Sequence, residues 1–427
     1  MIRVGESFCP GILHAVQAKD GLLTRIRVPG GMITPRQLTA VAELSASFAD
    51  GHVEITSRSN LQLRAIQKKD LNSVIQGLDS AGLLPSPEHD RVRNIVTSPF
   101  AGLGVDEILD TRPFVLELDR RLIADQVLIG LPPKFGFAID GGGAWFSRDS
   151  DDLALRAVSV GNNHWFHLAI GGVLSGFRVS VDQAIDCVLE AARICLSISK
   201  QFDMPARGRK IASVPEALTT LLRGLSRFLT ACNCPDNSRF VGDMPIGVYS
   251  SERVGFSTLV PAVHLGRLTA EQMNSLASIA NEFDGDVRLA PWRGVVLGSI
   301  PEGSISQITA RLVALGMSFD DKNGYRGIAA CAGSTGCDAS LADVRRDASL
   351  LARHLDGRKA KSGWTVNVSG CEKQCAMRNG ATAELIANSS GYSLRIRGQL
   401  IASDCSFESV LEKVAACQAE TPLEVFS

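Results

Sequence analysis

The sequence has almost no net charge, because 44 lysine and arginine residues are balanced by 45 aspartate and glutamate residues. This balance argues against a general polyanion binder, so no nucleic-acid partner is expected, although local basic clusters could bind a small acidic ligand. No apolar run approaches the roughly eighteen residues of a membrane span, so no membrane partner is expected either. The first ten residues lack the apolar core of a secretory signal. We therefore expect a cytoplasmic protein, whose thiols stay reduced and are available to metals.

Eleven cysteines are present, and four of them form two pairs. Cys331 and Cys337 are separated by five residues, and Cys371 and Cys375 by three. Glycines lie within the first pair and directly before the second, where they would let backbone N–H groups approach a bulky anionic sulfide cluster. Four thiolates in this pattern predict a metal centre. The alternatives are buried structural thiols or a zinc knuckle, which usually has tighter spacing.

Residues 22–66 predict a strand, a helix that begins after Thr34, and two further strands. The same pattern returns 235 positions later, where Thr269 and Gln272 match Thr34 and Gln37. Such a run of matches at one offset indicates an internal duplication of a βαββ unit. Two units alone would leave sheet edges unpaired, and pairing them about a pseudo-twofold axis removes those edges.

A chain of 427 residues with 45% hydrophobic content is long enough for several domains. We predict a first half-domain over residues 1–80, a first α/β domain over 81–203, a linker over 204–245, a second half-domain over 246–305 and a second α/β domain over 306–427 that carries the cysteine pairs. Within the first α/β domain, residues 114–118 look like a strand and residues 182–202 like a helix.

The two cysteine pairs, with Asn367-Val-Ser-Gly leading into Cys371, resemble the cluster-binding part of the nitrite and sulfite reductase superfamily. This resemblance covers most of the chain. It implies an α+β fold (α/β sandwiches): two ferredoxin-like half-domains related by a pseudo-twofold axis, and two α/β domains for cluster and substrate. It also implies that Cys331, Cys337, Cys371 and Cys375 hold a [4Fe–4S] cluster. In sirohaem-containing members the last cysteine also bridges to the haem iron.

The resemblance suggests substrate-binding roles for several basic residues. Arg58 matches an arginine that contacts tetrapyrrole or substrate, Arg93 matches another substrate-site arginine, and Arg64 projects from the strand after Arg58. Lys134 matches the first lysine of a Pro-Arg-Lys-Phe-Lys pattern that surrounds a small anion in sulfite reductases. The second lysine position is Gly136 here, which removes a cation and, we expect, makes room for a larger substrate.

In that departure the chain resembles the precorrin-3B synthase group of the superfamily. The group's reaction would use precorrin-3A, dioxygen and NADH-derived electrons delivered by an unidentified donor or reductase, with a mononuclear non-haem iron expected beside the cluster. No ligand set for that iron emerges, because His164 and His167 would point to opposite faces of a strand. Further candidates are a thiol site at Cys232 and Cys234, an aromatic face at Trp292, and basic neighbours for substrate carboxylates at Arg25, Arg27, Arg207, Arg209 and Lys210. The alternatives are a sirohaem-dependent sulfite or nitrite reductase and a non-catalytic iron–sulfur electron-transfer protein.

Overall fold

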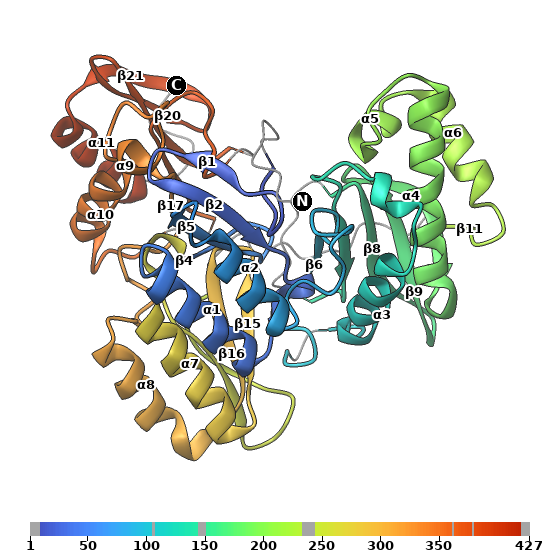
Figure 1. Ribbon diagram of the computed structural model, residues 1–427, viewed down its shortest axis with the longest axis horizontal. Coiled ribbons are helices and arrows are strands. Elements are labelled where there is room, and N and C mark those ends of the chain that lie inside the picture. Colours follow the sequence, from blue (N-terminus) through green and yellow to red (C-terminus); the bar gives the residue numbers. More distant parts are fainter. Residues whose placement is uncertain are drawn as a thin grey trace.

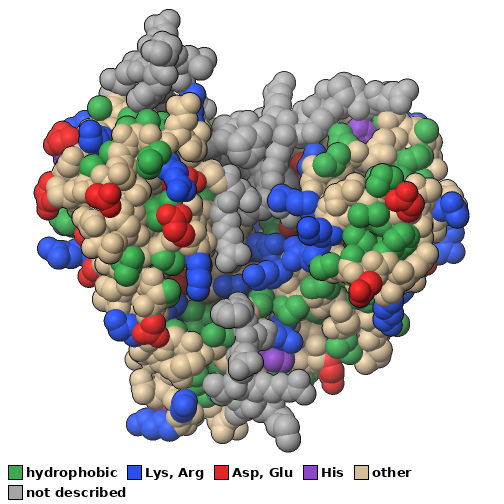
Figure 2. All heavy atoms as spheres, turned by 90° about the horizontal axis from the view of Figure 1, so that it is seen from above, with side chains coloured by type: hydrophobic (Ala, Val, Ile, Leu, Met, Phe, Trp, Pro, Cys, Tyr) green, Lys and Arg blue, Asp and Glu red, His purple; other side chains and the backbone are tan. Residues whose placement is uncertain are grey.

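The computed structural model of the chain describes residues 9–104, 107–143, 151–232, 244–360, 363–377 and 380–419. In Figure 1 the first α/β segment, coloured teal to green, forms a lobe of its own. A larger body beside it holds the two half-domains, blue and yellow, and the C-terminal segment in orange and red. Figure 2 shows lysine and arginine side chains gathered in the hollow between the two lobes.

Two five-stranded sheets form the half-domains, and each borrows a strand from the other repeat. The first has the order β1-β2-β5-β4-β14 and the second β12-β13-β16-β15-β3. The first repeat supplies β1 (Val16–Ala18), β2 (Gly21–Ile26), β3 (Met32–Ile33), β4 (His52–Ile55) and β5 (Leu61–Ile66). The second supplies β12 (Gly247–Ser250), β13 (Phe256–Val260), β14 (Arg267–Thr269), β15 (Asp286–Ala290) and β16 (Gly294–Pro301). The exchange of β3 and β14 covers one edge of each sheet and confirms the predicted duplicated architecture.

The duplication extends to backbone details. Thr34 and Thr269 both form capping boxes, with glutamine at the third helical position, at the starts of α1 (Pro35–Phe48) and α7 (Ala270–Phe283). Left-handed residues also recur at matching positions: Ser59 with Arg293, and Ala65 with Ser299. Equivalent strand pairs carry register shifts at equivalent places. These features are consistent with two copies of one folding unit.

A single hydrophobic core joins the half-domains. Helices α1 and α7 pack against each other, with α2 (Leu71–Ser80) and α8 (Ile305–Ala314) beside them. Ile308 and Leu312 of α8 and the following Met317 are buried in this core, so the second half-domain extends beyond residue 305.

The first α/β lobe contains a six-stranded sheet of order β11-β10-β9-β8-β7-β6. Its strands are β6 (Ile95–Thr97), β7 (Phe137–Asp140), β8 (Leu153–Val160), β9 (Asn163–Ile170), β10 (Val173–Ser180) and β11 (Thr230–Ala231). Helices α3 (Arg112–Ile123) and α4 (Ala184–Gln201) share a core with one face of this sheet. Residues 114–118 are thus helical and not a strand, because Val115, Leu118 and Leu122 recur at helical spacing and are buried against the sheet.

Part of the predicted linker belongs to this lobe. Helices α5 (Gly208–Ala212) and α6 (Pro215–Gly224) lie there, and Ile211, Ala217 and Leu221 are buried in the core of the lobe. Burial of these side chains holds the segment against the lobe. A free linker would leave such side chains exposed.

The C-terminal segment forms a sheet of order β17-β18-β19-β20-β21. Its strands are β17 (Ile328–Ala330), β18 (Val366–Ser369), β19 (Ala383–Asn388), β20 (Gly391–Ile396) and β21 (Gln399–Cys405), and its helices are α9 (Gly333–Gly336), α10 (Val344–Leu355) and α11 (Phe407–Ala419). Throughout the described residues, no helix combines the length and apolar character that crossing a membrane requires.

Candidate iron–sulfur and substrate site

The cysteine pairs follow two neighbouring strands. β17 and β18 are paired in parallel, with Ile328 opposite Val366 and Ala330 opposite Val368. Cys331 directly follows β17, and Cys371 follows β18 after one glycine. Because adjacent parallel strands end at the same edge of a sheet, the topology brings loops separated by about forty residues of sequence to one place.

The loop backbone is arranged around the Cys331 sulfur. The N–H of Gly370 donates to Cys331 Sγ at 3.3 Å, and the N–H of Leu341 donates to the Gly370 carbonyl at 2.8 Å. A Cβ atom on Gly370 would lie 1.8 Å from Ser340 Oγ, so only glycine fits between the two loops. Gly370 thus lets the backbone approach a cysteine sulfur, and the approach to a cluster stays a prediction.

Cys371 and Cys375 of the second loop lie close enough to Cys331 to affect its pKa. Burial raises the pKa of the Cys331 thiol, and the nearby Cys375 and Cys371 raise it further. Hydrogen bonds from the N–H groups of Gly333 and Gly370 act in the opposite direction, because they stabilise the thiolate. Cys337 ends α9 on the same loop as Cys331.

The chemistry of the donor set suits a cluster. Iron–sulfur clusters are held by cysteine thiolates, and in a [4Fe–4S] cluster each of the four thiolates binds a different iron. Four cysteines with backbone N–H groups aimed at a sulfur are suited to such a cluster.

Arg64 connects the first half-domain to the cysteine loop. Its Nε and Nη2 donate to the Asp20 carboxylate at 3.0 and 3.1 Å, and Nη2 also donates to the Gly336 carbonyl at 2.7 Å. The Arg64 side chain is only 7% exposed. Its donors are therefore directed at Asp20 and Gly336, an arrangement that supports the position of the residue preceding Cys337.

Four arginines form what we call the arginine group: Arg25 and Arg27 on and after β2, Arg58 between β4 and β5, and Arg293 between β15 and β16. Burial lowers the pKa of Arg25, and the nearby Arg58 and Arg293 lower it further, whereas Cys9 acts in the opposite direction. Arg293 donates through Nη2 to the carbonyl of Ala376, the residue after Cys375. The arginine group thus reaches from the half-domains to the second cysteine loop.

Arg27 is the most deeply buried member. Its Nη2 donates to the carbonyls of Pro10 at 3.3 Å and Arg91 at 3.5 Å, and lies 3.7 Å from Cys9 Sγ. Its Nε and Nη1 are buried without a hydrogen-bond partner among the described residues. Burial lowers its pKa to about 10, so it remains charged at neutral pH. A buried cation with unused donors is unfavourable alone, and a bound anion would offset that cost.

Lys134 and Gly136 lie beside Arg58. The Arg58 Nη1 donates to the Lys134 carbonyl at 3.2 Å, and the Lys134 side chain is exposed. A Cβ atom on Gly136 would lie 2.7 Å from Asp151 Oδ1 and 3.7 Å from Arg58 Nη2. The space that we expected Gly136 to open is thus partly filled by the Asp151 carboxylate. Relative to the reductase pattern, this position has lost a cation and has a carboxylate close by.

The other residues that the sequence suggested for substrate binding lie outside the arginine group. Arg93 is buried and donates through Nε and Nη2 to both Asp119 oxygens at 2.7 Å, which ties it to α3. Trp292 packs against Phe100, with ring centroids 6.3 Å apart. Arg207 pairs with Asp152 at 2.8 Å, whereas Arg209 and Lys210 are exposed on α5.

No ligand set for a mononuclear iron is present among the described side chains. His164 and His167 both lie on β9, and they have different partners: His164 Nδ1 is 3.1 Å from Ser159 Oγ, and His167 Nε2 is 3.1 Å from Cys232 Sγ. Cys234 lies outside the described residues.

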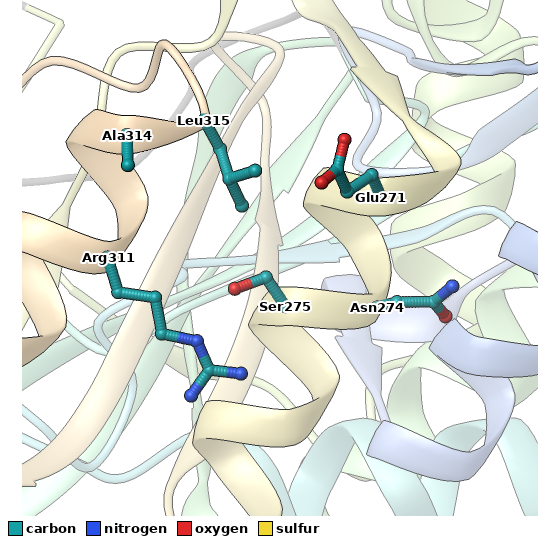
Figure 3. A pocket seen from close by; sticks show the side chains of 6 residues that line it. All are labelled: Glu271, Asn274, Ser275, Arg311, Ala314 and Leu315. Atoms are coloured by element: carbon teal, nitrogen blue, oxygen red, sulfur yellow. The ribbon is translucent and has the colours of Figure 1, made fainter.

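Two surface cavities lie elsewhere. One, of about 440 Å³, lies between α7 and α8, where Glu271, Ser275 and Arg311 point toward it (Figure 3). Another, of about 470 Å³, lies beside β2 and β5 and is lined in part by Gly21, Leu22 and Lys68. Neither is lined by the four cysteines or the arginine group.

Sequence reasoning missed three contributors, Asp20, Asp151 and Arg293. Asp20 precedes β2 and reaches Arg64 across the sheet, and Asp151 precedes β8 and reaches Gly136. Neither aspartate lies in a recognisable sequence motif. Arg293 could have been found from the repeat, because it directly follows Trp292 and occupies the position equivalent to Ser59.

Comparisons with known proteins agree with this architecture. The nitrite/sulfite reductase ferredoxin-like half-domain model matches residues 14–81 and 251–315, which are the two repeats. A ferredoxin–nitrite reductase from Synechococcus elongatus is 27% identical over 92% of this chain and 80% of its own length. A precorrin-3B synthase from a Sinorhizobium species is 29% identical over 91% of this chain and 82% of its own length.

The fold is also similar to that of the Mycobacterium tuberculosis NirA protein. The TM-score is 0.77 at 21% identity, with 95% of this chain and 82% of the other covered. Both repeats and the full-length similarity lead to one conclusion: the chain contains two nitrite/sulfite reductase ferredoxin-like half-domains, within a fold similar to that of NirA.

Proposed function

We propose that this protein is a precorrin-3B synthase, which hydroxylates precorrin-3A with dioxygen and forms its lactone in aerobic cobalamin biosynthesis. In this proposal Cys331, Cys337, Cys371 and Cys375 hold a [4Fe–4S] cluster, and the electrons come from NADH through a separate donor. The similarity to the Sinorhizobium enzyme supports the assignment. Because nitrite reductases are similar at nearly the same identity, the choice between them rests on the site.

The observation that carries the proposal is the pairing of Gly136 with Asp151 beside Arg58. An anion such as sulfite or nitrite needs several charge-assisted donors on its oxygens. Here one lysine of the reductase pattern is replaced by glycine, and a carboxylate oxygen lies 2.7 Å from the Cβ position of that glycine. The missing cation and the nearby carboxylate both weaken a small-anion site, which favours another substrate.

The arginine group suits a substrate with several carboxylates. Precorrin-3A carries acetate and propionate side chains, and a guanidinium binds carboxylates with paired hydrogen bonds. Arg27 has two buried donors without partners among the described residues, and Arg58 lies close enough to lower its pKa. In the proposed complex Arg25, Arg27, Arg58 and Lys134 bind and orient the substrate, whereas Arg64 and Arg93 hold the surrounding loops.

The cluster would supply single-electron transfer at a potential tuned by ligation, hydrogen bonds and exposure. The chain's own contribution is the position of the sulfurs: Gly370 donates to Cys331, and Arg293 bonds to the backbone next to Cys375. We also propose a mononuclear iron for dioxygen activation, without assigning its ligands.

The second candidate function is a sirohaem-dependent nitrite or sulfite reductase, which the similarity to the Synechococcus enzyme favours. A non-catalytic iron–sulfur electron-transfer protein is the third. Both would share the cysteine loops with the first candidate, so the loops alone do not distinguish the three.

One anaerobic preparation distinguishes them. Iron and sulfide are counted, the absorption spectrum is recorded, and the protein is then supplied with precorrin-3A, dioxygen and a reductant. A precorrin-3B synthase gives cluster absorbance without a sirohaem Soret band, and its product gains the mass of one oxygen atom. A Soret band with nitrite or sulfite turnover would overturn the proposal, and so would an unchanged pigment.

Two variants test the residues. Arg27→Gln is expected to raise the KM for precorrin-3A by about tenfold or more, because it removes a charge-assisted carboxylate contact. The matched control is Arg209→Gln, since Arg209 is exposed on α5. Gly136→Lys is expected to lower precorrin-3A turnover while strengthening nitrite or sulfite binding. Equal KM values for the two arginine variants would contradict the substrate-binding role.

A further inference from the structure

A thiol–imidazole pair lies in the first α/β lobe, outside the site described above. His167 Nε2 is 3.1 Å from Cys232 Sγ, and His167 is only 5% exposed. Cys232 directly follows β11, where its N–H donates to the Gly176 carbonyl at 2.9 Å. Cys232 as a residue is half-buried, unlike the fully buried Cys187 and Cys195 of the same lobe.

The pair lies on the face of the sheet opposite to α3 and α4. Phe166 and Leu168 belong to the core that these helices share with the sheet. Successive side chains of a strand point to opposite faces, so His167 points away from the helices. The imidazole is therefore separated from the main core of the lobe, on a face that carries polar side chains.

Charged residues flank the imidazole on this face. The sheet register places Arg156 of β8 and Arg178 of β10 directly opposite His167 on either side. Asp140 of β7 lies opposite Arg156, and its Oδ1 accepts a hydrogen bond from the Gly142 N–H. Residues directly opposite in neighbouring strands have Cβ atoms about 5 Å apart. The Arg178 guanidinium stacks over the Trp165 ring, 4.4 Å from its centroid. The strands on either side of His167 thus each carry one arginine next to it, and the carboxylate lies one strand further away, a charge balance that favours an anion at Cys232.

We propose that Cys232 is a reactive thiol, activated by His167 and the flanking arginines, that is oxidised by hydroperoxides. A thiolate, not a thiol, is the nucleophile, and nearby cations and an adjacent base increase the thiolate fraction. This inference is independent of the tetrapyrrole reaction. It assigns a modification site on the lobe that does not carry the cluster cysteines.

The oxidation step is balanced with hydrogen peroxide as the oxidant. The Cys232 proton moves to His167 Nε2, and the thiolate sulfur attacks one peroxide oxygen. The O–O bond breaks, a sulfur–oxygen bond forms, and the leaving hydroxide takes the proton from the imidazolium. The sulfur is oxidised by two electrons to sulfenic acid, and the peroxide is reduced to one water molecule.

Alkylation of the cluster-loaded protein by iodoacetamide tests the activation, with mass spectrometry reporting the rate at each cysteine. Cys405 is the matched control, because it is also half-buried but donates its thiol proton to the Ser403 carbonyl at 3.4 Å. At neutral pH Cys232 is expected to react about tenfold faster, because a neighbouring imidazole and nearby cations increase the thiolate fraction. Its rate should also rise at a lower pH than that of Cys405. Equal rates and equal pH profiles would overturn the proposal.

Two further measurements separate activation from simple exposure. His167→Gln should slow the alkylation of Cys232 by about tenfold and leave Cys405 unchanged, with the cluster spectrum used to verify folding. In the unmodified protein, brief exposure to hydrogen peroxide followed by dimedone should label Cys232 in preference to Cys405. Labelling of both cysteines at the same rate would contradict the oxidation step, even if the His167→Gln variant did not fold.

Discussion

Replacing Arg64 with methionine should loosen the first cysteine loop. The buried guanidinium makes two hydrogen bonds to Asp20 and one to the carbonyl of Gly336, which directly precedes Cys337. Methionine fills a similar volume but donates nothing. The variant leaves the Asp20 carboxylate, 18% exposed, without its cation and the Gly336 carbonyl without its donor.

The magnitude follows from these contacts. Breaking a buried ion pair by removing one partner costs about 3–5 kcal/mol, and partial exposure of Asp20 lowers that figure. A hydrogen bond to a charged group contributes about 1.5–3 kcal/mol. A local cost of about 3 kcal/mol corresponds to a roughly hundredfold increase in the equilibrium opening of the loop.

Hydrogen exchange on the cluster-loaded protein measures that opening. The Leu341 amide, which donates to Gly370, reports on the loop. We expect its exchange to be about a hundredfold faster in Arg64→Met. Arg120→Met is the control, because Arg120 is exposed on α3 and pairs with Glu117 at the surface. If the Leu341 amide exchanged at the same rate in both variants, the anchoring role of Arg64 would be refuted.

Three further predictions concern the cluster and pH. Cys371→Ser should abolish the visible cluster absorbance, because a hydroxyl is a poor ligand at neutral pH, whereas Cys187→Ser, buried on α4, should retain it; an intact spectrum in the first variant would remove Cys371 from the ligand set. Gly370→Ala should lower the iron content, since the new Cβ would lie 1.8 Å from Ser340 Oγ, and Ser340→Gly should restore part of it; no rescue would contradict this steric cause. Burial raises the pKa of Glu107 to about 7, so the folded state binds more protons than the unfolded state between about pH 4.5 and 7 and loses stability as the pH rises through that window. Glu107→Gln should flatten this slope in thermal denaturation between pH 4.5 and 7, and an unchanged slope would contradict it.

The sequence was informative wherever a local rule determines structure. The capping residues Thr34 and Thr269 each mark a helix start, and both form the predicted capping box. The repeat was visible because the same apolar positions must be buried twice. Residues 114–118 were wrongly predicted as a strand, because a short apolar run does not distinguish a strand from a buried helix face.

The candidate site was less predictable from sequence, because its contacts join distant segments. Arg64 and Arg93 are buried and bound to Asp20 and Asp119, which no motif links to them. The role of Gly136 likewise depends on Asp151, which approaches only in the folded lobe.

The sequence by itself determined the duplication, the spacing of the four cysteines and the resemblance to a superfamily, because periodicity, capping and thiol spacing are properties of short segments. Tertiary structure decided which charges meet. The exchange of β3 and β14 and the parallel pairing of β17 with β18 bring the cysteine loops and four arginines from separate segments to one region. The physical reason is that burial and Coulomb energy depend on distance in space, which no spacing along the chain specifies.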